Sequence, residues 1–94
     1  MLILIAYDVA TADKAGARRL RRVARACSDY GQRVQNSVFE CNVGSPQWVV
    51  LRERLLREIK PEEDSLRFYF LDRDVTIENH GRKEPLDLSA PLIL

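Results

Sequence analysis

The chain is poor in the residues that build most metal sites and disulfide scaffolds. Its 94 residues include two cysteines and one histidine, and Cys27 and Cys41 do not have the spacing of zinc ligands. A disulfide between them would need an oxidising compartment, and nothing in the sequence signals export. The sequence also has no glycine-rich loop of the kind that cradles phosphates. Zinc modules, disulfide-stapled scaffolds and P-loop proteins are therefore poor matches to this chain.

Long apolar runs are missing as well. The apolar stretch that opens the sequence spans five residues, with no basic region or cleavage site beside it. It predicts neither a signal peptide nor a membrane span, and we expect a cytoplasmic protein. Its continuous apolar character instead predicts a strand buried on both faces, which ends at Tyr7 and Asp8.

Charge is plentiful but unevenly distributed. The chain has fifteen Lys and Arg against fourteen Asp and Glu. Residues 1–35 contain seven basic and three acidic residues, which leaves eight basic and eleven acidic residues for positions 36–94. A basic half on a nearly neutral chain indicates an anionic partner for one face of the protein.

Hydrophobic spacing predicts the elements along the chain. A helix is expected from the caps at residues 11–13 to about Asp29, with Gly31 as the left-handed residue that follows it. A second helix is expected to begin at Ser45 as cap, with Pro46 in its first turn. The predicted strands after the first one are Gln32–Asn42, Ser65–Leu71 and a short Val75–Glu78.

In chain order these elements run β-α-β-α-β-β. With a hidden pairing of the second and third strands, they predict an α+β fold of the ferredoxin-like β-α-β-β-α-β plan, with residues 1–94 as a single domain. Both helices should cover one face of the sheet. The other face, expected to carry Ile3 and Ile5 or their neighbours together with Phe39 and Tyr69, still needs a cover. The simplest cover is the sheet of a second copy, related by a two-fold axis. The apolar end Leu92–Leu94 is expected to add a strand to a neighbouring sheet edge.

Asp8 is the first candidate for chemistry. As a lone acid at a strand end it can be a simple turn residue, and composition alone favours that interpretation. Mg²⁺ usually takes one or two carboxylates and keeps several waters. Two Asp8 side chains that face each other across a dimer axis would form a symmetric metal site, able to orient a water for attack on a phosphodiester. Metal binding and dimerisation are therefore one hypothesis.

The arginines of the first helix are the second candidate. Only Asp13 and Asp29 balance them, at the two helix ends. Such an arc can be a solvated helix face, but an unpaired basic arc is typical of phosphate contacts that position a nucleic acid without reading its sequence. Arg33 on the following strand extends the patch. Tyr7 is a candidate for stacking or hydrogen bonding near the site, with core packing as its alternative role.

Several motifs together resemble the small CRISPR-associated endonuclease family, the partner of the spacer integrase. They are Tyr7-Asp8-Val9 at the end of the first strand, the long run over residues 30–41, the stretch over residues 64–69, Asn79-His80-Gly81 and the Pro-Leu-Ile-Leu end. The run Gly-Gln-Arg-Val-Gln-Asn-Ser-Val-Phe-Glu-Cys within residues 30–41 is the most specific. The resemblance covers nearly the whole chain and is strongest to the branch of the subtype I-C systems.

The resemblance implies a homodimer with facing sheets, in which an extra C-terminal strand completes the partner's sheet. It implies Mg²⁺ as the cofactor and the spacer integrase as a partner in new-spacer acquisition. It also implies cleavage of double-stranded DNA or single-stranded RNA, and leaves open whether integration needs that activity. Asp8 is then the metal ligand and, with Tyr7, a catalytic residue. The residues that this reading assigns to nucleic-acid binding are Arg18, Arg19, Arg22 and Arg33.

Two other functions remain compatible with the sequence. One is a non-catalytic structural subunit that dimerises, binds duplex DNA through the basic helix and bridges the integrase. The other is a dimeric module that binds a small ligand, which no loop favours and the basic helix opposes. Loss of cleavage on Asp8→Ala separates the enzyme from the structural subunit, whose salt-sensitive DNA binding should survive that change.

Overall fold

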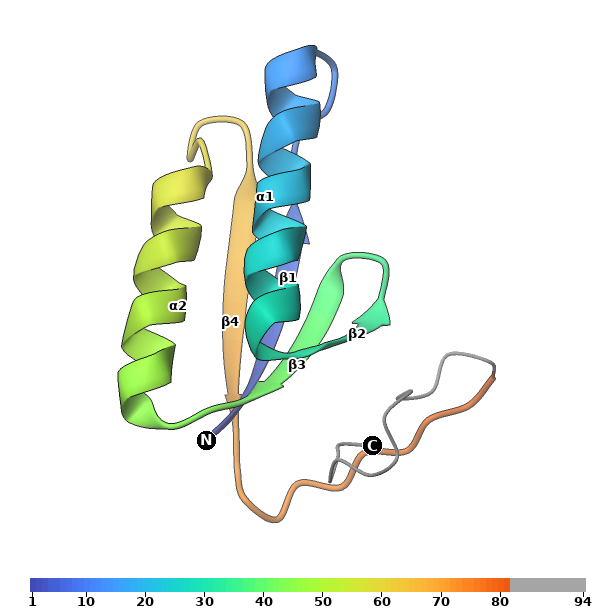
Figure 1. The fold of residues 1–94 in the computed structure, drawn as a ribbon. Coiled ribbons are helices and arrows are strands. Elements are labelled where there is room, and N and C mark those ends of the chain that lie inside the picture. Colours follow the sequence, from blue (N-terminus) through green and yellow to red (C-terminus); the bar gives the residue numbers. More distant parts are fainter. Residues whose placement is uncertain (82–94) are drawn as a thin grey trace.

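A four-stranded antiparallel sheet with two helices on one face forms the fold (Figure 1). The computed structural model describes residues 1–81. In chain order the elements are β1 (Leu2–Asp8), α1 (Lys14–Tyr30), β2 (Gln32–Gln35), β3 (Val38–Asn42), α2 (Ser45–Glu58) and β4 (Ser65–Leu71). The sheet order is β2-β3-β1-β4, with β1 between β3 and β4. This arrangement confirms the predicted α+β, ferredoxin-like plan.

The predicted strand over residues 32–42 is in fact a hairpin. Residues 36 and 37 form a turn that separates β2 from β3, and the register shifts between Arg33 and Gln35. The turn lets β3 pair with β1 while β2 takes the sheet edge. An uninterrupted strand over this segment was therefore wrong, because one straight strand cannot occupy two positions in a sheet.

Two further local predictions were wrong. Val75–Glu78 forms no strand within the described residues; the chain turns just before it, at residues 73 and 74, where the Val75 N–H donates to the Asp72 carbonyl oxygen at 3.2 Å. The turn directs the chain away from β4, whose outer edge is left unpaired among the described residues. The N-cap of α2 is Gly44 rather than Ser45, although Pro46 does lie in the first turn. The predicted C-terminal strand and the end Leu92–Leu94 lie outside the described residues.

Both ends of α1 are set by local contacts. The Asp13 carboxylate caps the helix by accepting from the Gly16 N–H at 2.8 Å. Gly31 follows the helix in extended backbone, with φ −156°, so its predicted left-handed conformation was wrong. Its lack of a side chain is needed for another reason. A Cβ at Gly31 would lie 2.4 Å from both the Cys41 sulfur and the Glu40 carbonyl oxygen.

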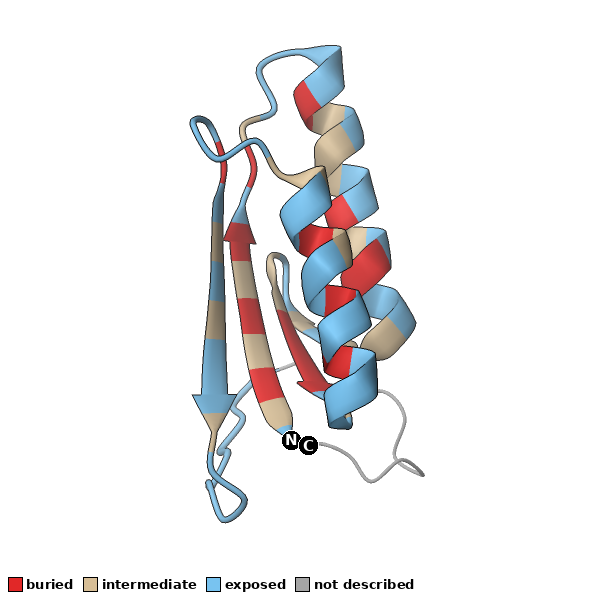
Figure 2. Ribbon diagram, turned by 90° about the vertical axis from the view of Figure 1, so that its left-hand side faces the viewer, coloured by how far each residue is buried: buried red, intermediate tan, exposed pale blue. Residues whose placement is uncertain are grey.

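The sheet has two different faces (Figure 2). The face under the helices holds the buried core, which consists of Ile3, Ile5, Tyr7, Val9, Val23, Ala26, Cys27, Phe39, Cys41, Trp48, Leu51 and Leu55. The opposite face carries no helix among the described residues. We call it the open face, and strand alternation and register assign to it Leu2, Leu4, Ala6, Asp8, Val38, Glu40, Arg67, Tyr69 and Leu71.

Burial alternates strictly along β1. Ile3, Ile5 and Tyr7 are buried, whereas Leu2, Leu4 and Ala6 are half-buried. The prediction that this strand is buried on both faces was therefore wrong for the described part of a single chain. Phe39 was also placed on the wrong face: it is opposite Ile5 and fully buried under the helices. Tyr69 does lie on the open face, where it is exposed.

No helix within residues 1–81 combines the length and apolar character that crossing a membrane requires.

Candidate functional site

Asp8 is the last residue of β1 and lies at the end of the open face. Its register partner is Ser65 of β4, and its side chain is exposed. A rigid central strand therefore presents this carboxylate at a sheet end, as the sequence predicted. Within residues 1–81, no group of three or more His, Cys, Asp or Glu side chains is placed to hold a metal ion. The hard oxygen donor suits Mg²⁺, but one chain supplies only half of a two-carboxylate site.

Tyr7 points to the opposite side of the sheet from Asp8. It is buried under α1 and stacks on Phe39 with ring centroids 6.2 Å apart. Its hydroxyl donates to the Asn36 carbonyl oxygen at 3.5 Å. Burial raises the pKa of the phenol, and the nearby Arg33 guanidinium opposes that rise. The structure thus separates the two adjacent residues predicted to act together, and the catalytic role of Tyr7 stays a prediction.

Arg33 continues the aromatic stack. Its guanidinium carbon lies 5.0 Å from the centroid of the Phe39 ring, so β2 holds this cation against the aromatic pair at the sheet edge. Arg33 is exposed, but it does not line the groove formed by the arginines of α1.

Arg19 has a different environment from the other predicted arginines. Its Nε donates to Asp64 Oδ2 at 2.9 Å and its Nη2 to Asp64 Oδ1 at 3.2 Å. The Asp64 side chain is fully buried and also accepts from the backbone N–H groups of Ala10 and Lys60. Arg19 hydrogen bonding and these backbone donors hold the pKa of Asp64 below its usual value. Arg19 therefore ties α1 to the start of β4 and lies apart from the basic surface.

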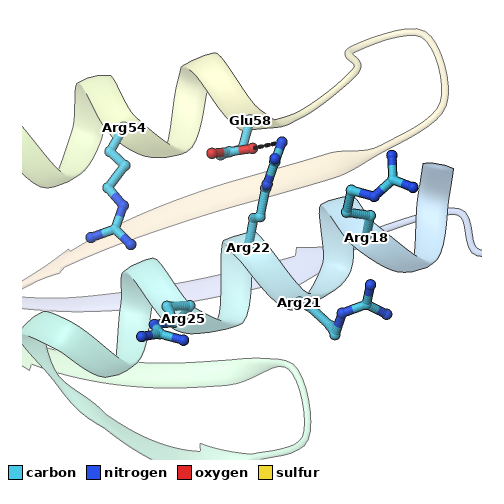
Figure 3. A pocket seen from close by; sticks show the side chains of 6 residues that line it. All are labelled: Arg18, Arg21, Arg22, Arg25, Arg54 and Glu58. Carbon is cyan, nitrogen blue, oxygen red and sulfur yellow. Dashed lines mark ion pairs between the residues drawn. The ribbon is translucent and has the colours of Figure 1, made fainter.

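The remaining arginines of α1 form one wall of a groove (Figure 3). We call it the arginine groove; its volume is about 460 Å³ and its lining residues are Arg18, Arg21, Arg22, Arg25, Arg54 and Glu58. Arg22 pairs with Glu58 at 3.7 Å, and Arg54 of α2 pairs with Asp29 at 2.9 Å. Arg18, Arg21 and Arg25 form no ion pair within residues 1–81. The groove therefore carries an excess of positive charge, since only Arg22 and Arg54 of its five arginines are paired with an acid within residues 1–81.

The structure thus brings together two of the four predicted nucleic-acid contacts, Arg18 and Arg22. Sequence reasoning missed the contribution of Arg54 to the groove and the tie between Arg19 and Asp64. A usable signal existed for Arg19, which lies at i+3 from Gly16 and i−4 from Val23, both buried. Helical spacing therefore turns it toward the core side of α1. For Arg54 no comparable signal exists, because the approach of the two helices sets the groove.

Two other ionisable features do not form a second site. Glu40 is buried on the open face, where burial raises the pKa of its carboxyl group, and it lies four residues along the sheet from the Asp8 position. Cys27 and Cys41 are free, buried thiols. Burial raises the pKa of Cys27 to about 12 and that of Cys41 to about 11, so neither is poised as a nucleophile.

Known proteins resemble the chain over most of its length. A sequence profile of the family described as CRISPR associated protein Cas2 matches residues 1–76. The chain is 58% identical over 96 residues to the CRISPR-associated endoribonuclease Cas2 of Chlorobaculum tepidum, with 100% of both chains covered. It is 52% identical over 95 residues to the CRISPR-associated endonuclease Cas2 of Halalkalibacterium halodurans, with 99% of both covered. The crystal structure of Streptococcus pyogenes Cas2 at pH 6.5 superposes with a TM-score of 0.76 at 48% identity, and covers 86% of this chain and 100% of that one.

Proposed function

The chain belongs to the CRISPR-associated protein Cas2 family, and from this premise we propose that it is a Mg²⁺-dependent endonuclease that acts as a homodimer in spacer acquisition. The observation that carries the proposal is the place of Asp8. It is an exposed carboxylate, at the end of a central strand, on the one sheet face that no helix of the described residues covers. The subtype I-C affinity stays a prediction.

The open face supports a dimer with facing sheets. On this face Leu2, Leu4 and Ala6 are only partly buried, and Tyr69 is 41% exposed. A small domain gains stability by covering such a surface, and a two-fold axis makes one self-complementary patch sufficient. The same axis brings two Asp8 carboxylates toward each other. Dimerisation then supplies the second half of the metal site.

In such a dimer the two Asp8 carboxylates would hold Mg²⁺. The bound Mg²⁺ supplies water activation and neutralisation of charge on the phosphate. Hydrolysis forms a bond between the water oxygen and phosphorus and breaks one bond from phosphorus to a sugar oxygen. One proton of the water ends on the released sugar hydroxyl. The rigid strand keeps each Asp8 in place without loop movement.

The arginine groove supports nucleic-acid binding on the other side of the molecule. Its cations contact phosphates and position a strand without reading bases. We assign this role to Arg18, Arg21, Arg22, Arg25 and Arg54, and treat Arg33 at the sheet edge as a separate contact. Because the groove and the open face lie on opposite sides of the sheet, binding and cleavage are separable by mutation.

We further propose that the dimer assembles with the spacer integrase in the cytoplasm. A single structural alternative deserves the same test: a dimer that binds duplex DNA and bridges the integrase without cutting. The relatives are named endoribonuclease or endonuclease, so both RNA and DNA belong in the assay.

The deciding experiment compares cleavage of labelled double-stranded DNA and single-stranded RNA by the wild type, Asp8→Asn and Asp74→Asn, with Mg²⁺ or with EDTA. Asp74 is an exposed acid outside the sheet and serves as the matched control. We expect cleavage that needs Mg²⁺, disappears in Asp8→Asn and persists in Asp74→Asn. Equal cleavage by all three proteins, or none, would leave the structural alternative in place.

A further inference from the structure

Arg67 is the one basic residue in the three strands β1, β3 and β4. Its register partner is Ala6, whereas Asp8 is paired with Ser65. Arg67 and Asp8 are therefore diagonal neighbours on adjacent strands and share the open face. Such diagonal neighbours are about 7–8 Å apart, with their Cβ atoms somewhat closer.

The guanidinium of Arg67 is held away from Asp8 by its own strand. Its Nη1 donates to the Tyr69 hydroxyl at 2.8 Å, and its central carbon lies 6.0 Å from the Tyr69 ring centroid. Arg67 is exposed and forms no ion pair with an acid of residues 1–81. A cation that stands beside a carboxylate without pairing to it keeps its charge available for a third group.

We infer that Arg67 binds the phosphate that is attacked at the Asp8 site; this inference rests on the proposed nuclease function. The diagonal spacing leaves room for a phosphate between the metal-binding carboxylate and the guanidinium. The Tyr69 hydroxyl accepts from one of the five N–H groups of the Arg67 guanidinium. The other N–H groups can donate to two oxygens of one phosphate. In the two-fold dimer each chain contributes one Arg67, so a phosphate at either side of the axis meets a cation.

The role differs from that of the arginine groove. The groove is lined by α1 and α2 on the helix side of the sheet (Figure 3) and would position the strand at a distance, while Arg67 lies on the open face with Asp8. Loss of Arg67 should therefore lower kcat more than it weakens overall binding, because the guanidinium contacts the group whose charge changes in the transition state. The competing role is a contact between the two copies, in which Arg67 pairs with an acid of the partner.

The test follows ¹⁵N-labelled full-length protein by NMR during titration with a dinucleotide that contains a single phosphodiester, in the presence of Mg²⁺. In the wild type we expect shifts at the Arg67 Nε–H and at the backbone N–H groups of Asp8 and Ser65. Arg67→Gln should weaken this binding by roughly tenfold or more. Arg73→Gln, an exposed arginine just beyond the far end of β4, is the matched control and should bind like the wild type.

Parallel cleavage and mass measurements separate the possible failures. We expect Arg67→Gln to stay dimeric by light scattering and to lose about 100-fold in kcat/KM. An unmoved Arg67 Nε–H, equal dinucleotide binding by Arg67→Gln, or a monomeric Arg67→Gln that still binds the dinucleotide would each overturn the inference. If the wild type shows the Arg67 shifts but no cleavage that depends on Asp8, the nuclease proposal fails and the phosphate site stands.

Discussion

A single buried carboxylate, Asp64, joins three segments of the chain. It accepts from the Arg19 side chain of α1, from the Ala10 N–H after β1, and from the Lys60 N–H after α2. We expect Asp64→Ala to lower the free energy of unfolding by roughly 2–3 kcal/mol, because it leaves several donors without an acceptor. Urea titration measures this change. Glu63→Ala is the control, since the Glu63 contact to Arg19 is longer and exposed and should contribute less than about 1 kcal/mol.

The same residue gives a pH dependence with a defined sign. The pKa of Asp64 is lower in the folded chain, chiefly through the Arg19 hydrogen bonds, than in the unfolded chain, where it is about 3.9. Its stabilising contribution is therefore complete above that value and is lost as the pH falls through the lower, folded pKa. Unfolding measured between neutral and acid pH should show this loss in the wild type and not in Asp64→Ala. A parallel acid dependence in both proteins would contradict the assignment.

Residue identity alone could not separate neighbours with opposite environments. Tyr7 and Asp8 were predicted as partners because they are adjacent, yet strand alternation puts them on opposite faces. Arg18 and Arg19 were treated alike, although one lines the groove and the other pairs with Asp64. Alternation and helical spacing were available for both decisions. The acceptor of Arg19 was not, because it lies 45 residues away in the sequence.

At the scale of elements, the arginine groove needs both helices. Its charge predicts duplex DNA binding that weakens with salt, with a slope of about −0.9 in log K against log salt for each phosphate contacted. The double variant Arg21→Gln, Arg25→Gln should lose two phosphate contacts, which makes that slope shallower by roughly 1.8. Binding is measured by fluorescence anisotropy in the Asp8→Asn background, so that the DNA stays intact.

Two variants of α2 sharpen this prediction. Glu58→Gln removes the one acid that lines the groove and should tighten binding, whereas Arg57→Gln changes an exposed arginine outside the groove and serves as the control. If Arg57→Gln weakens binding as much as the double change in α1, net charge rather than the groove determines the affinity.

The elements themselves were predictable where hydrophobic periodicity was strong. The boundaries Ser65–Leu71 were predicted as the structure has them, and the end of α1 differs by one residue. The hairpin was missed because its turn at residues 36 and 37 contains neither glycine nor proline, and the strand pattern continues through it. The extended Gly31 was missed because its cause, the close approach of Cys41, is a tertiary contact.

At the scale of the whole molecule, a single sequence describes half of the proposed site. The open face, with its partly buried aliphatic residues and the exposed carboxylate of Asp8, has no helix covering it among residues 1–81. No local pattern states the symmetry that would complete it. The two-fold arrangement was inferred from an uncovered face and from the need for a second carboxylate. The uncovered face is present among residues 1–81, while the dimer itself stays a proposal.

A mixing experiment tests whether cleavage needs both copies of Asp8. Wild-type and Asp8→Asn chains with different tags are refolded together in equal amounts, and native mass spectrometry checks that mixed dimers form. If the site requires two carboxylates, about one quarter of the dimers are competent, because a symmetric interface pairs the chains at random. Activity should then be about one quarter of that of wild-type protein at the same total protein concentration. A value near one half would mean that each Asp8 works alone, and the symmetric metal site would have to be abandoned even if the enzyme is dimeric.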